Sequence, residues 1–285
     1  MGELDVSGKL VAIDQTGAAA TMHVADVAVR VPPTGTLHYI HALKELCAEH
    51  RIGLLIPLTD LDVRSLARHR DKFADAGTEV MVGSPDTVMI CRDKTHTSEF
   101  FQRIGLPGIR TVTLGDFRAR PFFPCFIKPI RSSASVGAAI LRSEADLNSH
   151  LATFGELMLV QDYVQGAEFT LDIFCTRSGQ VKCVVPRQRL SIRCGEVEKG
   201  LTVNDPDLIR AGVLIGEGLN DIWGVVNAQC RRESGEQPRF FEITPRFGGG
   251  APLLLSAATA SARSSAISIA GPSLRTHSRY TGGST

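Results

Sequence analysis

The chain has 285 residues, which is long for one compact core and favours two or three lobes. A net charge of +1 gives no electrostatic reason to bind nucleic acid or an anionic membrane, and the content of 43% hydrophobic and 21% charged residues is ordinary for a soluble globular protein. No apolar run approaches the roughly 20 residues of a membrane span, and the first residues lack the layout of a signal peptide. The seven cysteines include no C-x-x-C pair, so we expect reduced thiols in a cytoplasmic protein.

Strand-like and helix-like segments alternate over the first 88 residues. Apolar runs at 9–14, 52–59 and 79–84 are typical of buried strands, and residues 36–50 carry apolar side chains at helical spacing. A second helix is expected over 60–77, with Asp60 as its N-cap and Gly77 at its end, and Ser84 and Pro85 open a third. This alternation predicts a small parallel α/β unit.

Short strands dominate from residue 109 onward, after a helix that begins near residue 93 and ends at Gly105. The expected strands cover 109–114, 122–128, 137–142, 157–163, 168–176, 181–193, 223–232 and 239–244, with hairpin turns at 177–180 and 233–237. Two helices interrupt them, one over 143–154 that starts with a capping box at Ser143 and Asp146, and one over 205–222. We expect an α+β part with antiparallel sheets, followed at 264–285 by a disordered tail of small polar residues.

Lys128 ends an apolar run, and a loop of small and hydroxyl-bearing residues that includes Ser132, Ser133, Ser135 and Gly137 follows it. Small residues let backbone N–H groups approach an anion, hydroxyls add donors, and the lysine supplies charge, so the segment predicts a phosphate-binding loop. It is not a Walker loop, because G-x-x-x-x-G-K-[ST] is absent. The alternative is an edge lysine whose ammonium reaches solvent.

Two segments place carboxylates where a nucleotide would need them. Glu168 follows an expected kink, where its carboxylate could accept ribose hydroxyls; the alternative is an exposed strand residue. Gln229 and Glu242 lie on strands joined by a turn, and strand alternation puts Glu242, Thr244 and Arg246 on one side. Oxygen ligands suit Mg²⁺, and an adjacent arginine suits a transferred phosphate. The alternative is a surface hairpin with alternating charge.

Arg187, Arg189 and Arg193 alternate along one expected strand and so share a face. They could hold a substrate carboxylate or the phosphate being transferred, and a solvated face is the alternative. Lys94, which precedes a helix, would be read as a surface residue on its own.

In this order, the segments resemble the ATP-grasp superfamily, and in particular the carbamoyl phosphate synthetase large-subunit-like ligases, including the pyrrolysine-biosynthesis type of amino-acid ligase. The resemblance covers about residues 9–256 and depends on the ordered set "ADVAVRVP", "IGLLIPLTD", "SPDTVMICRDK", "CFIKP", "QDYVQGAEFTLDIF", "VNAQC" and "FEITPRFGGGAP". It implies α/β and α+β architecture: a truncated Rossmann-like pre-ATP-grasp domain over 1–88 whose first strand is missing, then a two-subdomain ATP-grasp domain over 89–263 with its lid at about 107–163.

The same resemblance assigns a role to each motif. It places phosphate contacts on Lys94, Lys128, Ser133, Ser135 and Gly137; the adenine hinge on Gln161, Asp162, Tyr163 and Val164; the ribose contact on Glu168; metal ligands on Gln229, Glu242 and Thr244; and catalytic contacts on Arg246, Lys128 and Arg187.

The activity implied by the resemblance is an ATP- and Mg²⁺-dependent carboxylate–amine ligase, with Mn²⁺ able to substitute. A small carboxylate or amino acid is activated as an acyl phosphate and attacked by an amine, in a protein that relatives suggest forms a homodimer. The alternative is a non-catalytic or impaired ATP-binding fragment of such a ligase, because Thr244 stands where the family has asparagine and both ends depart from its pattern. A dinucleotide oxidoreductase is disfavoured, since no G-x-G-x-x-G follows the first strand.

Overall fold

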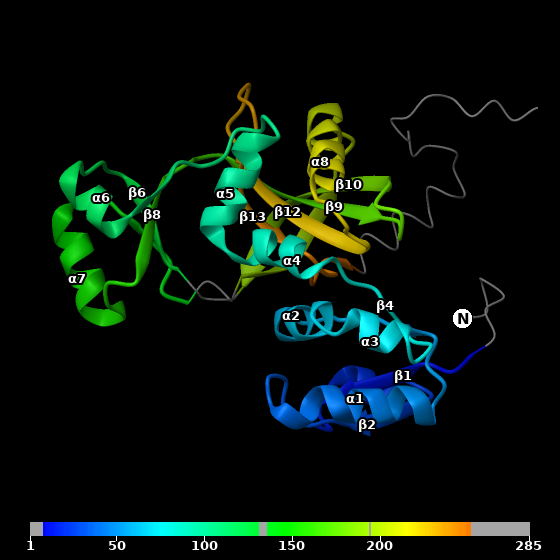
Figure 1. The fold of residues 1–285 in the computed structure, drawn as a ribbon. Helices are drawn as coiled ribbons and strands as arrows, with labels where there is room; N and C mark the ends of the chain where they lie inside the picture. Colours follow the sequence, from blue (N-terminus) through cyan, green and yellow to red (C-terminus); the bar gives the residue numbers. More distant parts are fainter. Residues whose placement is uncertain (1–7, 131–135, 194, 252–285) are drawn as a thin grey trace, which may run out of the picture.

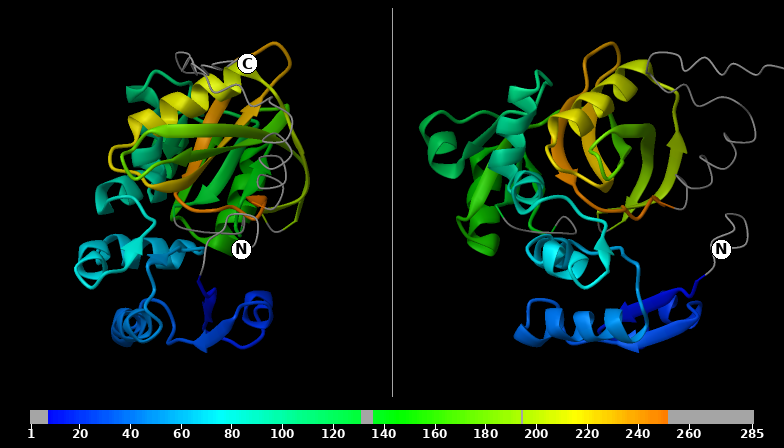
Figure 2. Two further views of the ribbon diagram at one scale, coloured as in Figure 1. Left: turned by 90° about the vertical axis from the view of Figure 1, so that its right-hand side faces the viewer. Right: turned by 45° about the vertical axis from the view of Figure 1, so that its right-hand side comes forward.

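The computed structural model describes residues 8–130, 136–193 and 195–251 and shows three lobes (Figure 1). Figure 2 shows from two further sides that the N-terminal lobe, drawn in blue, lies below the other two. The predicted tail at 264–285 lies outside the described residues. Among the helices of the described ranges, none combines the length and the apolar character needed to cross a membrane.

The N-terminal lobe is built from short strands and helices. It contains β1 (Val11–Asp14), a 3-10 helix (Ala20–His23), β2 (Val27–Arg30), α1 (Leu37–Glu49), β3 (Leu54–Leu55), α2 (Asp60–Ala67), α3 (Arg70–Ala74) and β4 (Glu79–Val80). β1 pairs with β2 and β3 with β4, both in parallel, which confirms the predicted parallel α/β unit. Side chains next to both pairs enter one core around Leu43, Leu66 and Phe73.

Several details of this lobe differ from the prediction. β2 was not among the expected strands, and the strand expected over 52–59 is limited to Leu54–Leu55. The helix expected over 60–77 is divided into α2 and α3 at Arg68 and His69. Its N-cap is Thr59, whose hydroxyl accepts a hydrogen bond from the Asp62 backbone N–H, so Asp60 lies one residue inside the helix. The carboxylate of Asp60 is therefore not used as the cap.

The lobe on the left of Figure 1, which covers the expected lid and is here called the lid lobe, is a four-stranded sheet with two helices. It consists of β5 (Thr111–Thr113), α6 (Leu114–Ala119), β6 (Cys125–Pro129), β7 (Ala139–Leu141), α7 (Glu144–Phe154) and β8 (Met158–Asp162), with strand order β5-β8-β6-β7. All its strand pairs are antiparallel, as predicted. The helix α6 was not predicted, because six residues are too few to show helical periodicity.

The large lobe is a five-stranded antiparallel sheet with helices on one face. Its strands are β9 (Ala167–Cys175), β10 (Val181–Arg193), β11 (Glu196–Thr202), β12 (Gly224–Arg232) and β13 (Arg239–Thr244), in the order β11-β10-β9-β12-β13. The helices α4 (Pro85–Arg92), α5 (Lys94–Arg103) and α8 (Pro206–Gly218) supply Cys91, Phe100, Phe101, Leu208 and Ile215 to the core on that face. Ser84 caps α4 as predicted.

The opposite face of this sheet is polar, although much of it is buried. Leu171, Ile173, Val226 and Ala228 point into the core, so the alternating residues of the same strands point to the other side. We call this side the polar face; it carries Thr170, Asp172, Arg187, Asn227, Gln229, Glu242 and Thr244. So many buried polar side chains on one face of a sheet are unusual, and they indicate a binding or catalytic site.

Candidate active site

Two rows of side chains cross the polar face. Arg187 is paired with Thr170, Thr170 with Gln229, and Gln229 with Glu242 in the strand register. In the next row Asp172 is paired with Asn227, and Asn227 with Thr244.

The register thus places the three predicted metal ligands together. Gln229 lies directly across from Glu242, and Thr244 follows two residues later on the same side. A β-bulge at Phe241 makes this possible, because it lets both Phe240 and Ile243 enter the core while Glu242 stays on the polar face. An amide oxygen, a carboxylate and a hydroxyl form a donor set that fits Mg²⁺, which also takes water and phosphate oxygens. In the described part of the chain, no group of three or more His, Cys, Asp or Glu residues offers another metal site.

Lys128 lies at the end of β6, where the lid sheet approaches the edge of β13. Its residue is 7% exposed, and its Nζ lies 5.8 Å from the centre of the Phe241 ring. Burial lowers the pKa of Lys128 to about 8, the nearby Glu242 carboxylate opposes that change, and the Lys94 ammonium adds to it. An anionic ligand here would remove the electrostatic cost of burying the charge.

Lys94 comes from the first turn of α5 and reaches the same region. Its Nζ donates to the backbone carbonyl of Ile130 at 3.4 Å, just beyond β6. The structure therefore brings together Lys94, Lys128 and Glu242 from three separate elements. Of the predicted phosphate loop, Ser133 and Ser135 lie outside the described residues, whereas Gly137 is described at its end.

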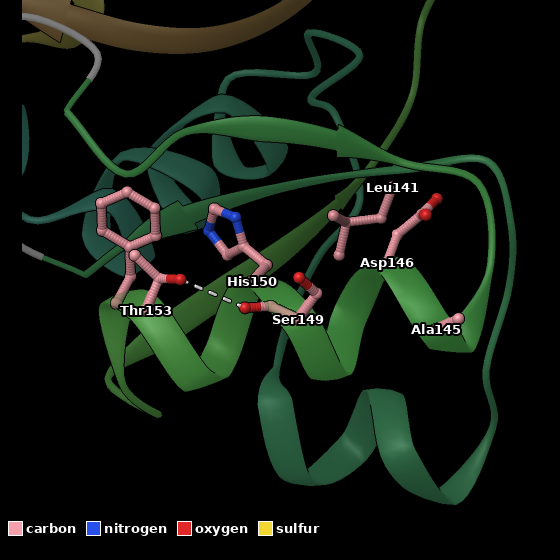
Figure 3. A pocket seen from close by; sticks show the side chains of 7 residues that line it. Leu141, Ala145, Asp146, Ser149, His150 and Thr153 are labelled. Carbon is pink, nitrogen blue, oxygen red and sulfur yellow. Dashed lines mark hydrogen bonds between the residues drawn. The ribbon is translucent and has the colours of Figure 1, made fainter.

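A hollow beside α7 in the lid does not belong to this cluster. Figure 3 shows it between α7 and β7, lined among others by Asp146, Ser149 and His150. His150 Nε2 lies 3.1 Å from the carbonyl oxygen of Gly137, which links α7 to the end of the loop.

The predicted adenine hinge lies at the end of β8. Gln161 is buried and donates to the Thr111 hydroxyl at 2.7 Å, and Asp162 accepts two hydrogen bonds from Arg110. Tyr163 is half-buried and Val164 is buried. The chain then passes close to Arg232 at Gly166, where φ is +95° and an added Cβ would lie 2.3 Å from the Arg232 carbonyl oxygen. Only glycine fits this approach.

Glu168, the predicted ribose contact, has two arginine neighbours. Its Oε1 lies 3.0 Å from Arg189 Nε and its Oε2 accepts from Arg231 Nη2 at 2.6 Å. The Glu168 side chain is 12% exposed, so the carboxylate is held rather than solvated. Arg231 was missed by the sequence reasoning, although strand alternation from Gln229 puts it on the same side.

Arg187 forms a buried ion pair with Asp172, a second residue that the sequence reasoning missed. Its Nε and Nη2 donate to the Asp172 carboxylate, and both side chains are at most 2% exposed. Burial raises the pKa of Asp172, and Arg187 opposes that rise. The face expected to hold three arginines does not extend to Arg193, because register shifts between Arg189 and Ile192 interrupt the alternation and Arg193 is 78% exposed.

Arg246 follows β13 and pairs across the lobe boundary. Its Nε and Nη2 donate to the two carboxylate oxygens of Asp60 at 2.7 and 2.9 Å, and its Nη1 donates to the Phe247 carbonyl at 2.8 Å. Asn227 Nδ2 donates to the Arg246 carbonyl, which holds its backbone over the polar face.

The glycines after Phe247 lie directly on the polar face. A Cβ added at Gly248 would lie 2.6 Å from Asn227 Oδ1, and one at Gly250 would lie 2.0 Å from Arg187 Nη1. These two polar atoms are buried and have no hydrogen-bond partner among the described residues. Polar atoms left in this way are uncommon in folded proteins, so they fit a site that binds a polar ligand.

Comparison with known proteins finds two matching families and several similar ligases. The family described as "PylC-like, N-terminal domain" matches residues 2–81, and the family described as "ATP-grasp in the biosynthetic pathway with Ter operon" matches residues 154–278. The 3-methyl-D-ornithine–L-lysine ligase of Methanosarcina acetivorans is 40% identical over 87 residues, which are 30% of this chain and 20% of that protein. The D-alanine–D-alanine ligase of Thermotoga petrophila is 33% identical over 103 residues, which are 32% of this chain and 31% of that protein.

Solved structures show the same fold at low identity. The biotin carboxylase domain dimer of Hydrogenobacter thermophilus 2-oxoglutarate carboxylase, in complex with MgADP, ADP and bicarbonate, superposes with a TM-score of 0.68 at 16% identity. The match covers 88% of this chain and 61% of that chain. The chain spans only 20% and 31% of the two curated relatives' lengths. The predicted fold class is confirmed, and the chain is similar to a PylC-like N-terminal domain over residues 2–81 and to an ATP-grasp family over residues 154–278.

Proposed function

We propose that the chain supplies the site of an ATP-dependent carboxylate–amine ligase that acts on a small carboxylic or amino acid. The observation that carries the proposal is the buried Lys128, which lies between the lid sheet and β13, close to Lys94 and Glu242. A lysine is stable in such a place when a bound polyphosphate compensates its burial. The matched relatives that ligate amino acids point to the same reaction class.

In this proposal ATP lies between the lid sheet and the polar face. Lys94 and Lys128 contact its phosphates, the segment from Gln161 to Val164 borders the adenine, and Glu168 lies near the ribose. Because Glu168 already contacts Arg189 and Arg231, these two arginines fix its carboxylate in one orientation.

Gln229, Glu242 and Thr244 would hold Mg²⁺, or Mn²⁺ in its place, and such a metal would supply positive charge next to the transferred phosphate. The residues of this chain bind, orient and shield the reactants. Arg187 and Arg246 lie at the same end of the polar face as the glycine segment and provide guanidinium groups for an acyl phosphate or a carboxylate. Water is excluded where Gly248 and Gly250 cover Asn227 and Arg187.

The test is calorimetric titration of the full chain with a non-hydrolysable ATP analogue and Mg²⁺. The wild type and a Lys182→Ala control, altered at an exposed lysine of β10, are expected to bind alike, whereas Lys128→Ala loses binding. A screen of small carboxylates and amino acids for ADP release follows, in which Glu242→Ala abolishes turnover while the fold persists. Binding or turnover that survives both substitutions would refute the assignment. Binding without turnover by any carboxylate would reduce the chain to an ATP-binding module.

A further inference from the structure

The contact between Asp60 and Arg246 joins two lobes at the edge of the candidate site. The two residues are 186 positions apart in the sequence, and both carboxylate oxygens of Asp60 accept hydrogen bonds from the guanidinium. Two-point pairing fixes both the position and the plane of an arginine side chain, which one hydrogen bond does not. The Arg246 side chain is 17% exposed and that of Asp60 is 41% exposed.

The structure also holds Asp60 in place. Thr59 caps α2, so the Asp60 carboxylate is left for another partner in the first turn of the helix. Arg92, at the end of α4, donates to the Asp60 backbone carbonyl. Asp60 is therefore held at its backbone by Arg92, and its carboxylate is directed at Arg246.

Other ion pairs link the N-terminal lobe to the large lobe, but they lie away from the polar face. Arg70 in α3 pairs with Asp221, which is in the turn between α8 and β12. Arg177, in the hairpin turn after β9, pairs with Glu79 in β4 at 2.7 Å. These two ion pairs hold the N-terminal lobe against the large lobe without Asp60. The Asp60 pair differs from them because Arg246 lies two residues after the end of β13, the strand that bears Glu242 and Thr244.

We propose that Asp60 is a positioning residue, by which the N-terminal lobe fixes the guanidinium of Arg246 for its contact with the transferred phosphate. This inference rests on the proposed function and adds to it a required residue from the N-terminal lobe. Arginine has a long side chain with many rotamers. A guanidinium that is already held in place can stabilise the transferred phosphate without the loss of side-chain entropy that ordering it would cost. Asp60 acts through Arg246 and does not itself contact the reacting atoms.

The test compares Asp60→Asn with two matched variants of the full chain. Asp221→Asn removes another ion pair across the same lobe boundary. Asp62→Asn removes a carboxylate of the same helix turn, which binds Tyr39, Thr34 and Thr59 within its own lobe. We expect Asp60→Asn to lower kcat by about 10- to 100-fold, the effect of a misplaced catalytic group, with KM for ATP and affinity for the ATP analogue within about twofold of wild type. Asp221→Asn and Asp62→Asn are expected to lower Tm and to leave kcat within about twofold.

A double-mutant cycle separates positioning from lobe docking. In an Arg246→Lys background, Asp60→Asn should have little further effect on kcat, because the group it positions is already gone. Equal losses of kcat in Asp60→Asn and Asp221→Asn would show that docking alone is involved, and a kcat within twofold of wild type in Asp60→Asn would also overturn the proposal.

A second readout does not depend on turnover. The ¹⁵N Nε–H signal of Arg246, identified by its loss in Arg246→Lys, should move and exchange faster with water in Asp60→Asn but not in Asp221→Asn. If no carboxylate supports ADP release by the wild type, the ligase proposal fails while this measurement still decides the contact. An Arg246 signal that Asp60→Asn leaves unchanged would refute the positioning role.

Discussion

Replacing Lys128 with methionine is expected to stabilise the ligand-free protein and at the same time to remove its nucleotide binding. The pKa of Lys128 falls from an ordinary value of 10.5 to about 8, chiefly through burial. Since a tenfold change in proton affinity corresponds to about 1.4 kcal/mol, holding this ammonium charged at pH 7 costs the folded state about 3 kcal/mol. Methionine keeps the unbranched apolar stem and removes the charge. Because Glu242 also loses its cationic neighbour, the net gain in unfolding free energy is expected to be about 1–3 kcal/mol.

The pH dependence gives the sign of this effect independently. The folded-state pKa of Lys128 lies below the unfolded-state value, so the unfolded chain binds more protons between about pH 8 and pH 10.5. Below pH 8 both states are charged and the full cost applies, and it declines as the pH rises through this window. The contribution of Lys128 to the free energy of unfolding therefore rises from pH 8 to pH 10.5 in the wild type and is absent in Lys128→Met.

Urea unfolding of both proteins at pH 7 and pH 9.5, without and with the non-hydrolysable ATP analogue and Mg²⁺, measures these effects. Lys182→Met at an exposed position of β10 is the matched control and should change the free energy of unfolding little at either pH. The analogue should stabilise the wild type and the control but not Lys128→Met. If Lys128→Met is less stable than the wild type without ligand, the ammonium is not held against a burial cost and the reasoning is wrong.

Two further predictions test the geometry of the site. Gly166→Ala should lower the free energy of unfolding by more than Gly179→Ala, which is expected to cost about 1 kcal/mol. Both glycines have positive φ, but only at Gly166 would the new Cβ meet a backbone carbonyl oxygen, at 2.3 Å. Urea unfolding of both variants measures this difference. Glu242→Gln should raise the Mg²⁺ concentration needed for half-maximal ADP release by at least about tenfold. Glu236→Gln, in the exposed turn between β12 and β13, is the control and should leave this concentration unchanged. Equal Mg²⁺ dependence of the two variants would show that Glu242 is not a metal ligand.

Local signals in the sequence predicted most of the architecture. Ser84, Ser143 and the hairpin turns at 177–180 and 233–237 act within a few residues of themselves, and each lies where the prediction put it. β11 was missed because "EVEKGLT" is polar and shows no apolar alternation. It lies at the edge of the sheet, where a strand has a neighbouring strand on one side only and need not be apolar. The sequence also put Gln229 and Glu242 within reach of each other on two strands joined by a turn, and the strand register pairs them directly.

The partners of the candidate site residues could not be predicted in this way. Asp60 looked like a helix cap because caps are read from neighbours in sequence, yet its carboxylate binds an arginine in another lobe. Asp172 was hidden inside an apolar strand, where nothing but the packing of β10 against β9 shows that it meets Arg187. Such contacts depend on how separate elements are brought together, and a single sequence contains no local pattern for them.

The cost of the polar face explains why its features belong together. Buried Lys128, the buried Arg187–Asp172 pair and the atoms of Arg187 and Asn227 that have no hydrogen-bond partner among the described residues each make the folded state less stable than an apolar face would. All of them lie on the same side of one sheet or at its edge, while the other side is an ordinary apolar core. Unfavourable burial that is confined to one surface is expected where a bound anion and a cation compensate it, and a chain selected for stability alone would not concentrate it there. In the positioning proposal the N-terminal lobe then has a direct part in the chemistry, because its Asp60 fixes the guanidinium of Arg246 at the end of this polar face.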